Sequence, residues 1–398
     1  YGTYVVIEST TPHNMETIRP FEVKVTENNP TTPQIWRVFI DREFNAKLRV
    51  IKKDADTKQT VLIPNTEFKI FNMDTNKYVE MITTYPSKKV HASFFTDEDG
   101  DLILPDVLPL GTYRIEEVAA PYGYVINDEY VTVMVDTDTF YEIDPDTYEA
   151  IITVEYEDAP AVGELTIEKK GEVLDAYKGG LFADSEDKEF VYKEGSLSGA
   201  KFEVYAAEDI FTADMQVDEN GKRTKYYSAG DLVATLVTRE DGKATLSDLP
   251  LGSYKVVEVE APYGYVLNRE EQAVTFVYVD DKTPVIKESM TFANERQKVD
   301  LSIDKLDEET QKGIAGAEFG LYASEDILNV DGKIIVEKDT LLEVAVSDEN
   351  GDIQFVKDYP LGSYYAREIK APAGYVSCDD IIEFDAEYQG QDVKAVKL

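Results

Sequence analysis

The sequence predicts an all-β protein built from tandem sandwich or barrel modules. Short segments alternate apolar and polar residues, turns rich in Gly, Asn and Asp separate them, and few segments have a helical period. One long motif also repeats: LPLGTYRIEEVAAPYGYV from Leu108 recurs as LPLGSYKVVEVEAPYGYV from Leu249 and as YPLGSYYAREIKAPAGYV from Tyr359. Repetition over such a long interval indicates a string of homologous domains.

The repeat spacing sets the predicted domain boundaries. A clipped copy, YGTYVVIESTTP, opens the chain, and the four motif glycines are 109, 141 and 110 residues apart, close to the size of one small domain. We expect the C-terminal part of a preceding module at 1–45 and a complete module at 46–161. A second module with a polar insert near 171–198 is expected at 162–297, and a third, truncated before its last strand, at 298–398.

Composition excludes several functional classes. The chain has 79 acidic and 40 basic residues, a net charge of −39 that repels nucleic acid and anionic membranes. No apolar run is long enough to span a membrane, so we expect no direct membrane insertion in this segment. Cys378 is the only cysteine and cannot form an internal disulfide. The modules must therefore be stabilised in another way.

Charged or amide side chains close three alternating apolar rows in each complete module. In the first module the rows end in Lys52, Glu117 and Asp158, and in the second they end in Lys169, Glu258 and Asn294. Period two places these groups on the apolar, inward face of each strand. Polar strand ends reaching solvent would explain one such row, but not the recurrence of all three. Lys53 and Lys170 are out of phase and are predicted to lie on the surface.

This trio suits spontaneous amide formation. Burial favours the neutral forms of lysine and glutamate, and a neutral amine is a nucleophile. The amine can attack the side-chain carbonyl of Asn or Asp, while a protonated glutamate polarises that carbonyl and transfers protons. Asn would lose ammonia and Asp would lose water. Proximity in a folded core supplies the rate without an external enzyme or cofactor.

The same residues carry a family resemblance. The L-x-[I/V]-x-K strand, the G-[T/S]-Y-x-x-x-E strand followed by A-P-x-G-Y, and the terminal Asn or Asp strand are similar to Cna protein B-type domains, also called SpaA-like or prealbumin-like repeats. The resemblance covers essentially the whole chain. It implies immunoglobulin-like β-sandwiches, each with a Lys–Asn or Lys–Asp isopeptide bond and a catalytic glutamate, as found in Gram-positive surface adhesins and pili.

The two end copies are predicted to be incomplete. The first has Glu8 as a catalytic candidate and Asp41 as an acceptor at the end of IWRVFID, but no lysine ahead of them. The third has Lys305 and Glu368 but no evident acceptor. Spacing in the other copies predicts one between about 401 and 409, past Leu398, so these copies are not expected to close their own bonds.

Other motifs predict no metal or cofactor. Asp97, Asp99 and Asp101 resemble the start of a calcium loop, but position twelve is Leu108, so the EF-hand pattern fails and a solvated turn is favoured. His13 and His91 lie in different modules, which argues against a histidine-based site. The polar insert is expected to be a decorated loop, with ligand binding as the alternative.

The sequence therefore predicts a structural role rather than an enzyme, apart from one autocatalytic turnover per module. The predicted function is a stalk, spacer or pilin-like shaft of an extracellular, cell-wall-anchored protein, whose anchor lies outside this segment. Its predicted partners are neighbouring pilin subunits. Two alternatives stay open: an adhesin that binds host extracellular matrix or glycan directly, and the spacer of an extracellular carbohydrate-active enzyme.

Overall fold

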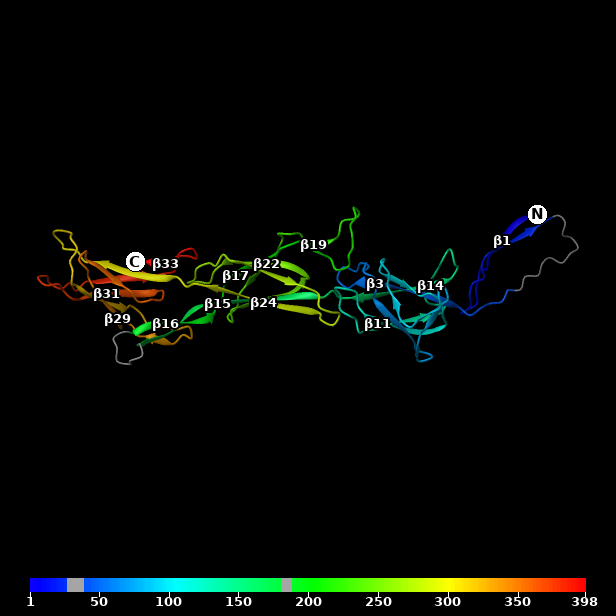
Figure 1. Ribbon diagram of the computed structural model, residues 1–398, viewed down its shortest axis with the longest axis horizontal. Helices are drawn as coiled ribbons and strands as arrows, with labels where there is room; N and C mark the ends of the chain where they lie inside the picture. The colour runs from blue at the N-terminus through cyan, green and yellow to red at the C-terminus, as the bar shows by residue number, and fades with distance from the viewer. Residues whose placement is uncertain (27–38, 180–187) are drawn as a thin grey trace.

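The computed structural model describes residues 1–26, 39–179 and 188–398 as an elongated row of β-sandwiches (Figure 1). All regular elements in the described residues are β-strands, which confirms the predicted fold class. None of these residues forms a helix of the length and apolarity that a membrane crossing requires. The modules lie end to end, with the N-terminal fragment at one end of the row and module 3 at the other.

The N-terminal fragment is a two-stranded ribbon. Its strands, β1 (Gly2–Val6) and β2 (Phe21–Val25), pair antiparallel with Gly2 opposite Val25. This pairing is equivalent to that of Gly111 with Val135 in the first complete module. Every residue of β1 is exposed, because the described part of the fragment provides no facing sheet.

Module 1 consists of two sheets that enclose one core. The first sheet contains β3 (Asn45–Asp54), β9 (Asp101–Ile103), β10 (Leu108–Pro109), β13 (Glu142–Ile143) and β14 (Ala150–Asp158). The second contains β4 (Glu67–Asn72), β5 (Lys77–Tyr78), β8 (Phe94–Phe95), β11 (Gly111–Ala119) and β12 (Val131–Val135). A separate hairpin joins β6 (Met81–Thr83) to β7 (Lys89–His91).

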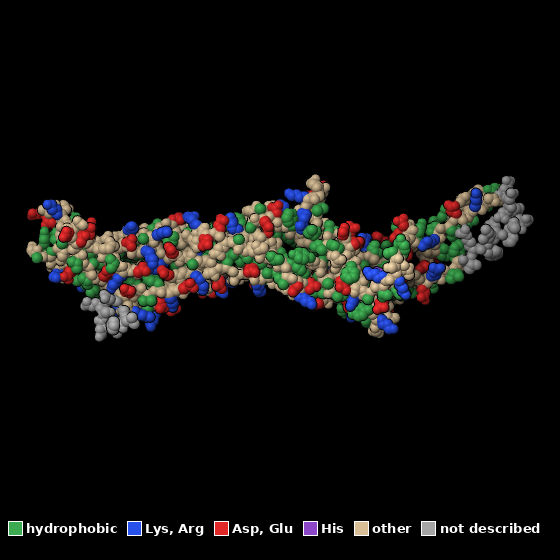
Figure 2. Space-filling model, viewed as in Figure 1, with side chains coloured by type: hydrophobic (Ala, Val, Ile, Leu, Met, Phe, Trp, Pro, Cys, Tyr) green, Lys and Arg blue, Asp and Glu red, His purple; other side chains and the backbone are tan. Residues whose placement is uncertain are grey.

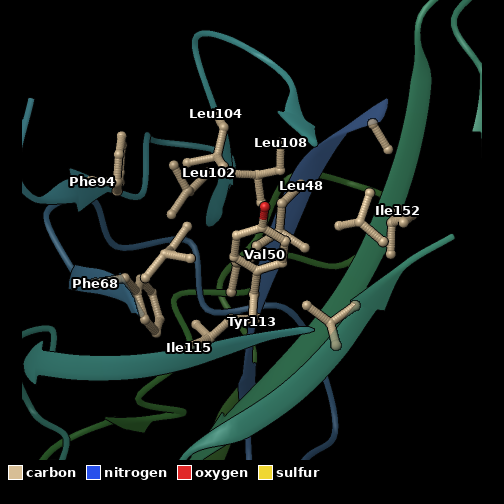
Figure 3. Close-up of a cluster of buried hydrophobic side chains, with 14 of the residues drawn as sticks. Leu48, Val50, Phe68, Phe94, Leu102, Leu104, Leu108, Tyr113, Ile115 and Ile152 are labelled. Atoms are coloured by element: carbon tan, nitrogen blue, oxygen red, sulfur yellow. The ribbon is translucent and has the colours of Figure 1, made fainter. Parts of the chain in front are cut away.

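The alternating sequence of the strands builds this core. Every second residue of β3 is buried, and its Leu48 and Val50 meet Phe68 and Ile115 of the facing sheet (Figure 3). The repeated Pro-Leu-Gly turn precedes β11 and is linked to it by a hydrogen bond: the hydroxyl of Tyr113 donates to the carbonyl of Pro109 at 2.9 Å. This bond fixes the turn relative to the strand. The same four-residue link recurs in modules 2 and 3.

Module 2 repeats the two-sheet plan. One sheet contains β15 (Val162–Gly179), β16 (Lys188–Ser196), β21 (Lys243–Pro250) and β24 (Val285–Asn294). The other contains β17 (Lys201–Ala206), β20 (Leu232–Val237), β22 (Gly252–Glu260) and β23 (Glu271–Phe276). The short strands β18 (Ile210–Phe211) and β19 (Lys225–Tyr227) form a hairpin.

Module 3 has the same plan and differs from the sequence prediction at its end. One sheet contains β25 (Lys298–Asp304), β30 (Asp352–Phe355) and β33 (Ala395–Lys397). The other contains β26 (Glu318–Ala323), β29 (Leu341–Val346), β31 (Gly362–Lys370) and β32 (Ile381–Ala386). The short strands β27 (Ile327–Leu328) and β28 (Ile334–Val336) form a hairpin. We expected truncation before the last strand. Instead β33 is present and pairs parallel to β25, as the last strand does in the other modules.

The polar insert of module 2 also differs from the expected decorated loop. Apart from residues 180–187, which lie outside the described residues, it continues β15 and returns as β16, so it forms a long hairpin. Phe190, Leu174 and Tyr177 of this hairpin belong to the hydrophobic core of module 3. Figure 1 shows β16 beside β29, and the hydroxyl of Tyr177 donates to the carbonyl of Leu342 on that strand. The insert therefore couples two modules.

Candidate functional sites

The strand pairing places the predicted lysine and acceptor side by side. In module 1, β3 and β14 run parallel with Lys52 opposite Tyr156, and Asp158 lies two residues further along β14. In module 2, Lys169 is opposite Phe292, and Asn294 again lies two residues further. Because side chains alternate, this step of two keeps the acceptor on the same face of the sheet as the lysine. The glutamate approaches from the facing sheet.

Module 1 brings Lys52, Glu117 and Asp158 together in a closed core. The Lys52 Nζ lies 2.7 Å from Oε1 of Glu117 and also contacts Oδ1 of Asp158, and all three side chains are fully buried. Burial raises the pKa of Asp158 to about 8; the Lys52 charge opposes this rise and the Glu117 carboxylate adds to it. The aspartate therefore holds its proton at neutral pH, and a protonated carboxyl is a better electrophile than a carboxylate.

Module 2 brings Lys169, Glu258 and Asn294 together in the same arrangement. The Lys169 Nζ lies 2.5 Å from Asn294 Oδ1 and 3.1 Å from Glu258 Oε1, and Asn294 Nδ2 donates to that glutamate oxygen at 3.0 Å. Burial lowers the pKa of Lys169 and raises the pKa of Glu258, although their mutual attraction opposes both shifts. The lysine thus contacts the oxygen and the glutamate contacts the nitrogen of the Asn294 amide, whose carbon Cγ is the atom that an amine would attack.

Aromatic rings close both sites to water. The ring centres of Phe68 and Tyr156 lie 5.7 and 4.6 Å from Lys52 Nζ. The ring centres of Phe202 and Phe292 lie 5.7 and 5.9 Å from Lys169 Nζ. In each module one ring comes from the second sheet and the other comes from the last strand, at the position opposite the lysine. The apolar surroundings favour a neutral amine, as the pKa of Lys169 illustrates.

A backbone contact holds each glutamate in all four copies. One carboxylate oxygen accepts the N–H of the residue ten positions later at 2.7 to 3.1 Å; the donors are Ile18, Asn127, Asn268 and Cys378. In modules 1 and 2 this residue is an asparagine whose amide also donates to the last strand, one residue before the acceptor. Sequence reasoning missed this support, although an Asn ten residues after both glutamates was a visible signal.

The acidic turn positions the lysine strand. The carbonyls of Gly100, Gly242 and Gly351 accept the backbone N–H of the site lysine in their modules at 2.9, 2.7 and 2.8 Å. Gly100 has φ +77°, and a Cβ there would lie 2.1 Å from the carbonyl oxygen of Val61, so a side chain would displace the neighbouring backbone. The DEDGD turn that resembled a calcium loop therefore has an evident structural task.

The two end copies have partial sites. In module 3, Lys305 Nζ lies 3.1 Å from Glu368 Oε1, and the lysine side chain is 19% exposed. Lys298 pairs with Ala395, an offset of 97, so the position equivalent to Asp158 and Asn294 is numbered 404, past Leu398. In the fragment, Glu8 keeps its contact with Ile18. Asp41 was predicted to face inward at a strand end, but it is exposed and lies in no strand; residues 35–38 of that segment lie outside the described residues.

Comparison with known proteins identifies the domain type. A family model described as SpaA, a prealbumin-like fold domain, matches residues 46–148, 189–291 and 299–397. These segments contain Lys52, Glu117, Glu258, Lys305 and Glu368, whereas Asp158, Lys169 and Asn294 lie between them, so the strand pairing was needed to assemble the two complete sites. No curated protein sequence matches the chain.

Solved structures give a likeness in fold. The Bacillus anthracis TIE protein is similar with a TM-score of 0.51 and 22% identity, over 90% of this chain and 50% of that chain. The chain thus spans half the length of that relative. BcpA, the major pilin subunit of Bacillus cereus, has a TM-score of 0.29 and 16% identity over 89% of this chain and 98% of that chain. The Corynebacterium diphtheriae major pilin SpaD has a TM-score of 0.21 and 16% identity over 91% and 99%.

Proposed function

Because the chain belongs to the SpaA prealbumin-like fold domain family, we propose that it is a load-bearing stalk or pilus-shaft segment of a Gram-positive cell-surface protein. The observation that carries this proposal is the pair of buried Lys–Glu–Asp/Asn sites in successive modules. In each module the lysine is on the first strand and the acceptor is on the last strand. A bond between them would join the point where the chain enters the module to the point where it leaves.

The proposed bond forms by one addition and elimination. The neutral Nζ of Lys169 attacks Cγ of Asn294 and forms the C–N bond, while a proton from Glu258 reaches the amide oxygen. The glutamate then moves a proton from Nζ to Nδ2, the C–Nδ2 bond breaks, and ammonia leaves. The proton on the oxygen returns to Glu258, so the glutamate ends in its starting form. Module 1 follows the same steps with Lys52, Glu117 and Asp158, and water leaves. No oxidant, metal or cofactor takes part.

Such a bond suits a molecule under tension. In module 1, force would pass along β3 to Lys52, across the bond to Asp158, and directly into the linker at residues 159–161. Residues 53–157 would carry none of that load. The closed loop would also restrict the unfolded chain, as a disulfide does, without depending on the redox state of the surroundings. An extracellular, cell-wall-associated location fits this requirement.

Intact-mass measurement of the purified chain tests the proposal. We expect a mass lower than that of the sequence by one ammonia and one water, with cross-linked peptides that join 52 to 158 and 169 to 294. Glu258→Gln should restore the mass of the ammonia alone, and Glu117→Gln should restore the mass of the water alone. A chain with the full sequence mass would refute the cross-links and remove the support for a load-bearing role.

A further inference from the structure

A cleft of about 410 Å³ lies between modules 1 and 2. Ile63 and Tyr122 of module 1 line one side, and Phe211, Tyr226 and Leu251 of module 2 line the other. Asp248 of module 2 also lines the cleft. Hydrophobic side chains gather on the visible face at this junction (Figure 2). Clefts of this size between domains, mostly apolar with few polar groups, are typical binding sites.

The next junction shows what covers the equivalent surface of module 3. Alignment of LPLG at 249–252 with YPLG at 359–362 makes Leu361 equivalent to Leu251 and Asp358 equivalent to Asp248. Leu361 packs into one hydrophobic cluster with Phe190 and Tyr192 of the β15–β16 hairpin. The hydroxyl of Tyr192 donates to the carbonyl of Asp358 at 3.1 Å. At the second junction, an aromatic β-strand therefore covers this surface.

Module 1 has no such hairpin after its lysine strand. Its shorter connection reaches module 2 through polar contacts: Leu62 N–H donates to the carbonyl of Asp214, and the hydroxyl of Thr57 donates to the Asp214 carboxylate at 2.7 Å. This connection does not cover the surface around Phe211, Tyr226 and Leu251. That surface therefore lines a cleft, whereas the equivalent surface of module 3 is part of a packed core.

The two junctions also differ in charge. Asp358 forms ion pairs with Arg296 and Lys298, and the Arg296 guanidinium lies 3.8 Å from the centre of the Tyr192 ring. The β-bridge position that Arg296 occupies opposite Tyr265 is occupied by Pro160 opposite Tyr124 at the first junction. Asp248 accordingly makes no ion pair with the described residues of the chain. The first junction thus lacks an aromatic strand and a cation that pairs with Asp248. Arg223 also lines the cleft, but its guanidinium lies 4.6 Å from the centre of the Phe211 ring.

We propose that the cleft between modules 1 and 2 binds an extended strand of a partner protein that carries an aromatic side chain next to a basic one. The aromatic ring would occupy the apolar space that Phe190 and Tyr192 fill at the second junction. The basic group would pair with Asp248, as Arg296 and Lys298 pair with Asp358. Desolvation together with the Asp54 charge raises the pKa of Asp56, which also lines the cleft, so a bound cation would also relieve repulsion there.

A peptide with the sequence of residues 188–193, KEFVYK, is the probe, added to the full 398-residue chain in isothermal titration calorimetry. We expect binding of KEFVYK, with KEAVAK at least tenfold weaker because it lacks both rings, and QEFVYQ weakened because it lacks the cations. Hydrogen exchange should show protection by the peptide at residues 210–227 and 248–251. Equal binding of KEFVYK and KEAVAK, or no binding of KEFVYK at millimolar concentration, would overturn the proposal.

Two variants assign the binding to the cleft. Asp248→Asn should weaken binding of KEFVYK about tenfold, since it removes one charged pair; asparagine tolerates the positive φ of +59° at this position. Pro160→Arg supplies a competing cation within the chain and should also weaken binding. Glu270→Gln, an equal change of charge at an exposed site outside the cleft, should leave it unchanged. Protection at 342–361 instead would mean that the peptide displaces the hairpin from module 3, which would refute the cleft as the site.

Discussion

Modules 1 and 2 hold the same lysine and glutamate on matching strands but differ in the third side chain. Asn294 is neutral, so module 2 needs only a neutral lysine and a neutral glutamate, and burial shifts both pKa values in that direction. Asp158 adds a second acid to module 1, and its pKa must rise before it can act as an electrophile; burial raises it to about 8. The proposed reaction would therefore release ammonia in module 2 and water in module 1, and burial shifts the pKa values of Lys169, Glu258 and Asp158 towards their neutral forms.

The largest expected effect follows from removing the proton carrier. Glu258→Gln should leave module 2 unlinked, and loss of a closed loop of this size costs about 4–5 kcal/mol of unfolding free energy. Its melting temperature should fall by roughly 15 °C. Glu117→Gln should do the same to module 1, and Glu260→Gln, on the same strand as Glu258 but exposed, should change neither. Calorimetry measures the melting temperature of each module, and intact mass shows whether its cross-link has formed. A Glu258→Gln chain with the cross-link in module 2 would show that the glutamate is not required.

A smaller effect is expected at the turn glycines. Gly100→Ala places a Cβ 2.1 Å from the Val61 carbonyl oxygen, whereas the backbone atom nearest to a Cβ at Gly242 lies 2.9 Å away, at Lys169. Both residues have positive φ. We expect Gly100→Ala to destabilise module 1 by about 2–3 kcal/mol and to slow its bond formation, and Gly242→Ala to cost about 1 kcal/mol in module 2. Denaturant unfolding of each variant checks the order, and the reverse order would contradict this account.

Bond formation should respond to pH differently in the two modules. Above pH 8 the Asp158 carboxyl loses its proton, so module 1 should close about tenfold more slowly at pH 9 than at pH 7. Asp158→Asn should abolish this fall and change the leaving group from water to ammonia. Chains purified unfolded and then refolded at each pH, with mass recorded over time, provide the rates. A fall in rate that persists in Asp158→Asn would assign it to another group.

The same shift has a consequence for stability before the bond forms. The pKa of Asp158 rises from an ordinary value of 3.8 to about 8 on folding, so between these values the folded state binds a proton that the unfolded state has released. The unfolding free energy of module 1 without its cross-link should therefore be greatest at low pH. It should fall as the pH rises from about 4 to about 8. Module 2 has no aspartate in this position.

The smallest effect is expected at the asparagines that connect the glutamate to the last strand. The Asn268 amide donates to the carbonyl of Ala293 at 3.1 Å, and the Asn127 amide donates to the carbonyl of Glu157 at 2.9 Å. Replacing either by Ala should cost about 1 kcal/mol and leave the bond intact, because the backbone N–H that holds the glutamate remains. Melting curves and intact mass together test this. Loss of the bond in Asn268→Ala would show that the amide also positions Asn294.

Most of each complete site could be predicted from the sequence because strand periodicity is local. Lys52, Glu117 and Asp158 each end an alternating apolar row, and that phase alone indicates an inward side chain. Asp41 was placed wrongly by the same reasoning: its row, IWRVFID, has an inward phase, but the residue is exposed and outside any strand. Phase indicates burial only where a facing sheet is present to cover the strand.

Contacts between distant segments could not be predicted in this way. The support of Lys52 by Gly100 and the register between β3 and β14 depend on how separate strands meet. The position equivalent to the acceptor in module 3 likewise became a single number, 404, only when the pairing of Lys298 with Ala395 was known. Sequence spacing alone had left a range of nine residues.

The sequence by itself determined the module count, the all-β class and the inward phase of the Lys, Glu and Asp/Asn rows, because these depend on repetition and on a two-residue period. Only the tertiary structure showed that the hairpin of β15 and β16 completes the core of module 3 and that the equivalent surface of module 2 lines a cleft. The physical reason is that the polar-looking insert at 171–198 turns one face, with Leu174, Tyr177, Phe190 and Tyr192, towards module 3. Whether that face is covered depends on the surface of the neighbouring module.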